Sequence, residues 1–165
     1  MAVIDEFLAA NRDYAASFDK GDLPLPPARK TAVVVCMDAR IDPAKALGLQ
    51  EGDAHVIRNA GGRVVEALRS LAISQQLLGT EQVAIIHHTD CGMLTFSDGD
   101  IRNKLRESLD ADADHIAFLP FSDLEQSVRD DLKVYERSPI VRHDIPVRGF
   151  VYEVETGKLR EVDAS

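Results

Sequence analysis

The sequence predicts an α/β fold: a mainly parallel β-sheet flanked by helices, with an N-terminal helical arm and a C-terminal strand or hairpin. Continuous apolar runs such as TAVVVCM, residues 31–37, are typical of strands buried on both faces, as in a parallel sheet. Helical patterns stand between these runs, and strands that alternate with helices favour a parallel sheet. The length of 165 residues is that of a single domain.

The N-terminal segment, residues 1–27, is expected to form an arm on the core, residues 28–165, within one domain that spans 1–165. Residues 3–18 carry apolar side chains at roughly helical spacing, which predicts an amphipathic helix. The prolines of GDLPLPP, residues 21–27, favour an extended stretch after it. Such a helix can pack on its own core or on a partner subunit, and the pattern leaves both open.

The remaining elements are marked by residues that begin or end them. Asp42-Pro43 supplies the N-cap and first turn of a short helix, and Gly79 ends a longer one. Ser122-Asp-Leu-Glu125 has the spacing of a capping box, and Glu155-Thr-Gly157-Lys158 is typical of a hairpin turn. In chain order we expect strands at 31–37, 54–58, 82–88, 148–155 and 159–162, a turn at 61–62, and helices from 42, over 64–78, over 98–109 and from 122 to about 137.

Composition and charge narrow the classes of function. The formal net charge is -9, and an acidic chain repels phosphates, so nucleic-acid binding is disfavoured. No run approaches the roughly 18 apolar residues that a membrane helix needs. The first residues lack the basic start and apolar centre of a signal peptide, so we expect a cytoplasmic protein. A structural disulfide between Cys36 and Cys91, the two cysteines, is not expected in that compartment.

Both cysteines fall where buried strands are expected to end. Cys36 begins the sequence CMDAR, and Cys91 ends the sequence HHTDC. Sites in open α/β sheets form outside the carboxyl ends of the strands, and neighbouring strands lie about 4.8 Å apart. Zinc favours thiolate and imidazole, and three protein ligands leave a fourth position open, as in catalytic sites. We therefore predict a zinc ion held by Cys36, His88 and Cys91.

Each part of this pattern also has a simpler explanation. A lone cysteine in an apolar strand is usually a core residue, and His-x-x-Cys alone is a weak motif. Asp38 and Arg40 could form only a salt bridge at a strand end. Because both cysteines lie at strand ends beside a histidine and an aspartate, the metal site is the favoured interpretation. His88 is preferred to His87 because successive strand residues point to opposite faces.

The sequence Cys36-x-Asp38-x-Arg40, followed by His88-x-x-Cys91-Gly92, resembles the signature of the β-class carbonic anhydrases. The stretches CMDARIDPAKALGLQEGDAHVIRNAGG and HHTDCGM are similar to the smaller microbial members, and the resemblance is close over residues 31–97. It implies one zinc ion per chain, held by Cys36, His88 and Cys91. The fourth ligand is then water or hydroxide, or Asp38 in a closed form. Asp38 and Arg40 are the implied catalytic residues, with Arg40 drawing Asp38 off the metal.

The resemblance further implies the reversible hydration of carbon dioxide to bicarbonate and a proton, by attack of zinc-bound hydroxide. It implies a homodimer, possibly paired into a tetramer, with the N-terminal helix on the partner subunit. The chain departs from the family in two ways. Residues 26–29 read Pro-Pro-Ala-Arg where larger members carry a bicarbonate-binding glutamine, and the chain has no tryptophan of the kind used by some members for inhibition by bicarbonate.

Other functions stay open at this point. Relatives of this fold hydrolyse carbonyl sulfide or carbon disulfide, which are linear analogues of carbon dioxide, and the same metal site would serve. A non-catalytic zinc-binding protein would need neither Asp38 nor Arg40, so these residues favour an enzyme. Two thiolates cancel the charge of zinc, so we expect activity to rise toward alkaline pH. Three histidines are candidate proton shuttles by composition alone: His55, His115 and His143.

Overall fold

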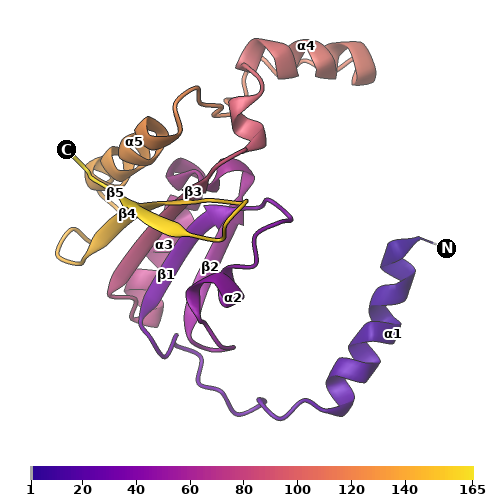
Figure 1. The fold of residues 1–165 in the computed structure, drawn as a ribbon, viewed down its shortest axis with the longest axis vertical. Coiled ribbons are helices and arrows are strands. Elements are labelled where there is room, and N and C mark those ends of the chain that lie inside the picture. Colours follow the sequence, from indigo (N-terminus) through magenta and orange to yellow (C-terminus); the bar gives the residue numbers. More distant parts are fainter. Residues whose placement is uncertain (1) are drawn as a thin grey trace.

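The computed structural model describes residues 2–165, and Figure 1 shows their arrangement. A β-sheet lies at the centre, and helix α1 stands away from it at the N-terminal end (Figure 1). Met1 lies outside the described residues. The elements in chain order are α1 (Val3–Ala16), β1 (Thr31–Cys36), α2 (Pro43–Leu47), β2 (Ala54–Asn59), the short 3-10 helix η1 (Ala60–Gly62), α3 (Val64–Leu78), β3 (Gln82–His88), the 3-10 helix η2 (Gly92–Leu94), α4 (Asp98–Leu109), α5 (Leu124–Arg137), β4 (Val147–Tyr152) and β5 (Leu159–Val162).

The sheet has the strand order β2-β1-β3-β4-β5, and its first four strands are parallel. Strand β5 is antiparallel to β4, so the predicted mainly parallel sheet and its C-terminal hairpin are confirmed. In the register of the sheet, Cys36 lies opposite Asn59, and His88 lies opposite Tyr152. The carboxyl ends of β1, β2, β3 and β4 therefore meet along one edge of the sheet.

The core is built on both faces of β1 and β3. On one face, Val34 and Ile85 pack with residues of α3 and α5 such as Leu71 and Tyr135. On the other face, Val33 and neighbouring residues form a second apolar cluster with partly buried residues of α2 and β4. Each fully buried branched apolar side chain contributes roughly 1.5–3 kcal/mol. This two-sided burial explains why the strands lack an apolar–polar alternation.

The described side chains of the N-terminal helix do not contribute to the core. Among the described residues of α1 none is buried, and Ile4, Phe7 and Leu8 expose 59 to 72% of their surface. The chain joins the core further on, where Ala28 and Arg29 donate backbone hydrogen bonds to the loop before β2. Helix α1 stands away from the sheet (Figure 1), and the exposure of its apolar side chains leaves an unpaired apolar surface among the described residues.

The start of α5 differs from the prediction. The expected capping box from Ser122 to Glu125 is wrong, because Asp123 is the N-cap and accepts a hydrogen bond from the Gln126 N–H at 2.9 Å. Aspartate caps helices as well as serine does, so α5 begins with a cap one residue later than the predicted one.

Strand β5 spans Leu159–Val162 as predicted, whereas β4 differs from the prediction. Strand β4 ends at Tyr152 rather than at 155, because the Glu153 carbonyl accepts from the N–H groups of Thr156 and Gly157 and so begins the hairpin turn there. Gly157 has a φ of +71°, which glycine adopts without strain.

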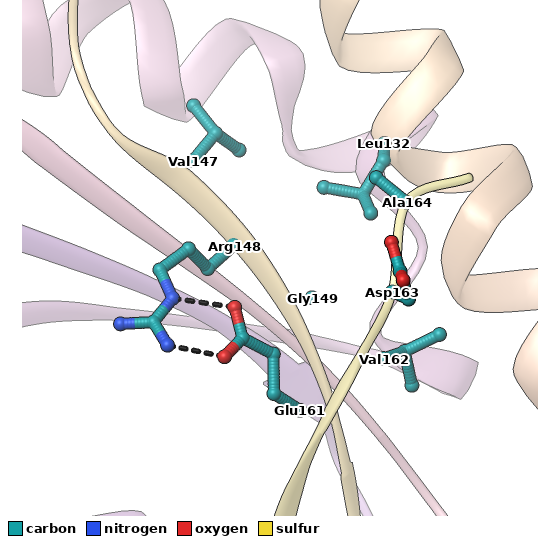
Figure 2. Close-up of a pocket in the computed structure, with 8 residues that line it drawn as sticks. All are labelled: Leu132, Val147, Arg148, Gly149, Glu161, Val162, Asp163 and Ala164. Carbon is teal, nitrogen blue, oxygen red and sulfur yellow. Dashed lines mark hydrogen bonds and ion pairs between the residues drawn. The ribbon is translucent and has the colours of Figure 1, made fainter.

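A surface hollow lies between the β4–β5 hairpin and α5. Figure 2 shows Arg148 of β4 pairing with Glu161 of β5 beside this hollow, with the Arg148 Nε donating to Glu161 Oε1 at 2.6 Å. Residues Val147 to Gly149 belong to the amino half of β4, so the hollow lies away from the edge where Cys36 and His88 end their strands. Within residues 2–165, no helix has both the length and the apolar character needed to cross a membrane.

Candidate metal centre

Three side chains that prefer zinc converge at the carboxyl edge of the sheet. Cys36 is the last residue of β1, His88 is the last residue of β3, and Cys91 follows three residues later. Their donor atoms all lie within 4.8 Å of one another, and all three residues are buried. A tetrahedral zinc site with bonds of about 2.0–2.3 Å places its ligand atoms roughly 3.5–3.8 Å apart. The cluster therefore fits zinc with a small contraction.

The His88 ring is oriented as a metal ligand. Its Nδ1 lies 2.7 Å from the Thr89 carbonyl oxygen. A carbonyl only accepts, so Nδ1 carries the proton and Nε2 presents a lone pair. Among the residues that the structure describes, the buried Nε2 has no hydrogen-bond partner. A buried nitrogen without a partner is costly unless something binds it, which supports a cation at this point.

The environment of Cys36 favours its thiolate. The adjacent Cys91 thiol, together with His88 and the backbone N–H of Gly61, lowers the pKa of Cys36 to about 4. The Gly61 N–H donates to Cys36 Sγ at 3.3 Å. The Cys36 thiolate and burial in turn raise the pKa of Cys91. In the metal-free cluster, Cys36 is therefore the first thiol to ionise, and a bound cation would favour the loss of both protons.

The turn that supplies the Gly61 N–H requires glycine. At Gly62, whose φ is +64°, an added Cβ would lie 2.9 Å from the Cys36 nitrogen and 2.9 Å from the Ile86 oxygen. These backbone atoms belong to β1 and β3 and cannot give way. The turn therefore seats against the strand that ends in Cys36 because Gly62 has no side chain.

Asp38 and Arg40 form a bidentate pair at the mouth of the cluster. The Arg40 Nε and Nη2 donate to the Asp38 carboxylate at 3.0 and 2.8 Å, and the Arg40 backbone N–H adds a third bond at 2.9 Å. These bonds hold the pKa of Asp38 far below its usual range. Asp38 Oδ2 lies 3.7 Å from His88 Nε2, too far for a hydrogen bond. An ionised carboxylate therefore stands beside the donor atoms of the cluster.

A second, largely buried polar network lies behind the strand. His87 points to the face opposite His88, as predicted, with its Nδ1 2.7 Å from Ser127 Oγ and its Nε2 3.0 Å from Asp131 Oδ2. The other Asp131 oxygen accepts from the Arg63 Nε and Nη2 at 3.2 and 2.9 Å. Asp131 therefore connects β3, next to His88, to the residue that follows the η1 turn.

Sequence reasoning missed Arg58 and Asp131. Arg58 of β2 donates to the Cys36 carbonyl from Nε at 3.0 Å and from Nη2 at 2.8 Å, and Nη2 also reaches the Asp38 carbonyl at 2.8 Å. It braces the loop between the two residues. A charged residue directly after the apolar Val56 and Ile57 of the predicted strand is the signal that could have identified it.

The candidate shuttle histidines do not join the cluster through the described contacts. His55 lies near the amino end of β2, at the opposite edge of the sheet, with its Nδ1 2.7 Å from Ser74 Oγ. His143 contacts the Ser138 carbonyl after α5, and His115 is an exposed loop residue. The hydrogen bonds of His55 and His143 go to Ser74 and Ser138, which lie outside the cluster.

The chain matches known proteins over nearly its whole length. A family model described as "Carbonic anhydrase" matches residues 31–159. Beta-carbonic anhydrase 1 of Mycobacterium tuberculosis is 48% identical over 165 residues, which is 98% of this chain and 99% of the relative. A carbon disulfide hydrolase of an Acidianus strain is 31% identical over 96% of this chain and 88% of its own. The crystal structure of carbonic anhydrase from Streptococcus mutans superposes with a TM-score of 0.94 at 46% identity, covering 99% of both chains.

Proposed function

The chain belongs to the β-carbonic anhydrase family, and from that membership we propose how its residues carry out the reversible hydration of carbon dioxide to bicarbonate and a proton. It is a carbonic anhydrase, a lyase. We propose that Cys36, His88 and Cys91 hold one zinc ion per chain. The observation that carries this proposal is the partnerless, buried Nε2 of His88 beside two thiols whose sulfurs lie within 4.8 Å of it.

A bound zinc ion supplies a Lewis acid that makes water nucleophilic near neutral pH. The protein residues orient the reactants around it. Asp38 stays ionised because Arg40 donates to both of its oxygens, so its carboxylate can only accept a hydrogen bond. A water that donates to Asp38 has its lone pair directed elsewhere, which is the role we assign to this carboxylate. In the closed form, Asp38 itself is the proposed fourth ligand.

The two thiolate ligands set the expected pH dependence. Two thiolates cancel the charge of a divalent cation, so the centre lowers the pKa of water less than three neutral histidines would. We therefore expect turnover to rise toward alkaline pH. A rate that is flat between about pH 6 and 9 would contradict this assignment.

Carbon disulfide remains the competing substrate. Relatives named carbon disulfide hydrolase are 31% identical to this chain, against 48% for beta-carbonic anhydrase 1. Both substrates are linear, so the same donor set can serve either, and access to the site decides between them. The higher identity favours carbon dioxide. A non-catalytic zinc protein is disfavoured because it would have no use for an ionised Asp38 beside its metal.

We also propose that the chain acts as a homodimer, or as a tetramer of such dimers, in the cytoplasm. The apolar side chains of α1 are exposed, and an isolated helix of 14 residues is marginal in water. A second copy of the chain is the occupant we assign to this helix. Residues 28–165 then form the core of one domain, and residues 1–27 form the arm.

The test is stopped-flow hydration of carbon dioxide by zinc-loaded protein at about pH 8.5, with metal-stripped protein as the control. Fast, zinc-dependent turnover is the expected result. Carbonyl sulfide and carbon disulfide are assayed beside it. Turnover of either sulfur compound without hydration of carbon dioxide would overturn the assignment of substrate. If none of the three compounds is turned over, the proposal that this site is catalytic fails.

A further inference from the structure

Arg40 is held by carboxylates from two different loops. The carboxylate of Asp38, in the loop after β1, accepts hydrogen bonds from the Arg40 Nε and Nη2. Asp90, in the loop after β3, accepts from the Arg40 Nη1 at 2.7 Å through Oδ2, and its backbone oxygen accepts from Nη2 at 2.9 Å. The guanidinium therefore joins the two loops that carry the candidate zinc ligands.

The position of Asp90 is itself fixed by the backbone around it. The Thr89 N–H donates to the Tyr152 carbonyl at 3.0 Å, and the Val154 N–H donates to Thr89 Oγ1 at 3.0 Å. These bonds attach the turn to the end of β4. Asp90 has a φ of +53°, in the left-handed region that aspartate tolerates better than most residues. The turn that carries this carboxylate is therefore a fixed point for the long and flexible Arg40 side chain.

We propose that Asp90 is a positioning residue that fixes the guanidinium of Arg40 and, through it, keeps the Asp38 carboxylate in the open form. The inference rests on the proposed function, since Asp38 must have a reaction to serve. With Asp38 as its sole partner, the Arg40 side chain could move together with that carboxylate. The bonds to Asp90 add a fixed point on the other loop, so the pair cannot turn toward the metal as a unit.

Exposure makes this role testable without loss of the fold. The Asp90 side chain is 78% exposed, and such ion pairs add little to folding stability. Two substitutions separate its charge, its hydrogen bond and its backbone. Asp90→Asn keeps a side-chain acceptor oxygen and tolerance of positive φ. Asp90→Gly keeps that tolerance and the backbone carbonyl that accepts from Arg40 Nη2, and loses only the side-chain acceptor. Glu155→Gln is the matched control, because Glu155 lines the same surface hollow as Asp90.

The first measurement is steady-state hydration of carbon dioxide by the zinc-loaded variants. We expect Asp90→Gly to lower kcat about 10-fold with KM nearly unchanged, as loss of a residue supporting a metal site commonly does. Asp90→Asn should lose only about 2- to 3-fold, because a neutral acceptor is about half as strong as a charged one. Glu155→Gln should match the wild type. Equal kcat in Asp90→Gly and the wild type would overturn the role of Asp90 alone.

A double-mutant cycle with Arg40→Ala identifies the route of the effect. If Asp90 acts through Arg40, adding Asp90→Gly to Arg40→Ala changes kcat by less than about 2-fold. A further 10-fold loss in that background would mean that the substitution disturbs the turn or Cys91, and would overturn the proposal.

Crystals of zinc-loaded Asp90→Gly give a readout independent of activity. The expected result is an Asp38 carboxylate released from Arg40 and turned onto the metal, and an unchanged Asp38–Arg40 pair would overturn the proposal. If the wild type itself shows no turnover, the proposed function fails, and the position of Asp38 in these crystals still decides the role of Asp90.

Discussion

Two arginine–carboxylate pairs at opposite ends of the sheet have the same forked geometry and different surroundings. Arg40 holds Asp38 at the carboxyl edge, and Arg148 holds Glu161 across the β4–β5 hairpin (Figure 2). The Asp38 side chain is 16% exposed and lies 3.7 Å from His88 Nε2, whereas the Glu161 side chain is 46% exposed beside a surface hollow. The pairing with arginine is therefore the same at both places, and what differs is the group that the carboxylate faces. That neighbouring group, and not the pairing itself, gives a salt bridge a function.

A third arginine–carboxylate pair, Arg63 with Asp131, is the most buried of the three. The Asp131 side chain is fully buried, and the Arg63 side chain is 12% exposed. Asp131 faces His87 and the Val64 N–H rather than the metal cluster. We therefore expect it to serve stability, with its effect on the cluster transmitted through β3.

The largest contrast should come from removing a candidate ligand at the carboxyl edge. Cys91→Ala leaves two donors of the three, so we expect zinc binding and zinc-dependent turnover to be lost together. Zinc content by atomic absorption and stopped-flow hydration measure the two. Glu161→Gln, at the other end of the sheet, is the control and should keep both. A Cys91→Ala protein that holds one zinc ion and turns over would refute the ligand set.

The next largest effect should follow from the buried pair. Asp131→Asn leaves Arg63 without its buried counter-charge, and breaking one partner of such a pair costs about 3–5 kcal/mol in the free energy of unfolding. Urea unfolding of the zinc-loaded protein measures it. Asp130→Asn is the matched control, since Asp130 is the exposed neighbour on α5. A loss for Asp131→Asn no larger than that of the control would mean the network contributes nothing to stability.

Asp38→Asn should divide activity from stability. Loss of its charge removes the ionised acceptor at the mouth of the cluster, so we expect turnover to fall about 100-fold with zinc content retained. Thermal unfolding should change less than in Asp131→Asn, because the Arg40 side chain left without its partner is 48% exposed to water rather than buried. Equal losses of activity in Glu161→Gln and Asp38→Asn would mean that the position of Asp38 beside His88 gives it no special role.

The smallest effect is a pH dependence of stability at the hairpin. The hydrogen bonds from Arg148 lower the pKa of Glu161 below its ordinary 4.5. A lowered folded-state pKa stabilises the fold above the ordinary value, and that contribution is lost as pH falls through the folded-state pKa. The urea midpoints of wild type and Glu161→Gln should therefore differ slightly at pH 7 and converge in acid. A difference that grows as the pH falls would contradict this sign.

The sequence predicted what depends on residue type and local spacing. Apolar runs located β1 and β3, and both ended where the sequence changed to polar motifs, so Cys36, His88 and Cys91 could be placed at one edge before any coordinates. Alternation along β3 separated His87 from His88. These inferences require only strand periodicity and the known position of sites in parallel sheets.

The residues that support the cluster could not be predicted in the same way. Asp131 meets His87 because α5 packs on β3 in one register, and Asp90 meets Arg40 because two loops lie side by side. The two contacts join residues 44 and 50 positions apart, and their geometry depends on tertiary packing. The helix start at α5 failed for a related reason, since Ser122 and Asp123 are both good caps and local spacing alone did not distinguish them.

The unpaired apolar surface of α1 has a consequence for how the enzyme behaves on dilution. Apolar side chains that are not buried within their own chain can be buried only by association with another molecule. Mass action then makes the buried fraction depend on concentration. Stability and turnover per chain become properties of the solution as well as of the sequence. A specific activity that falls as the enzyme is diluted would make cellular abundance a control on catalysis. A constant one would mean that self-association is complete at the lowest concentration measured or has no effect on turnover.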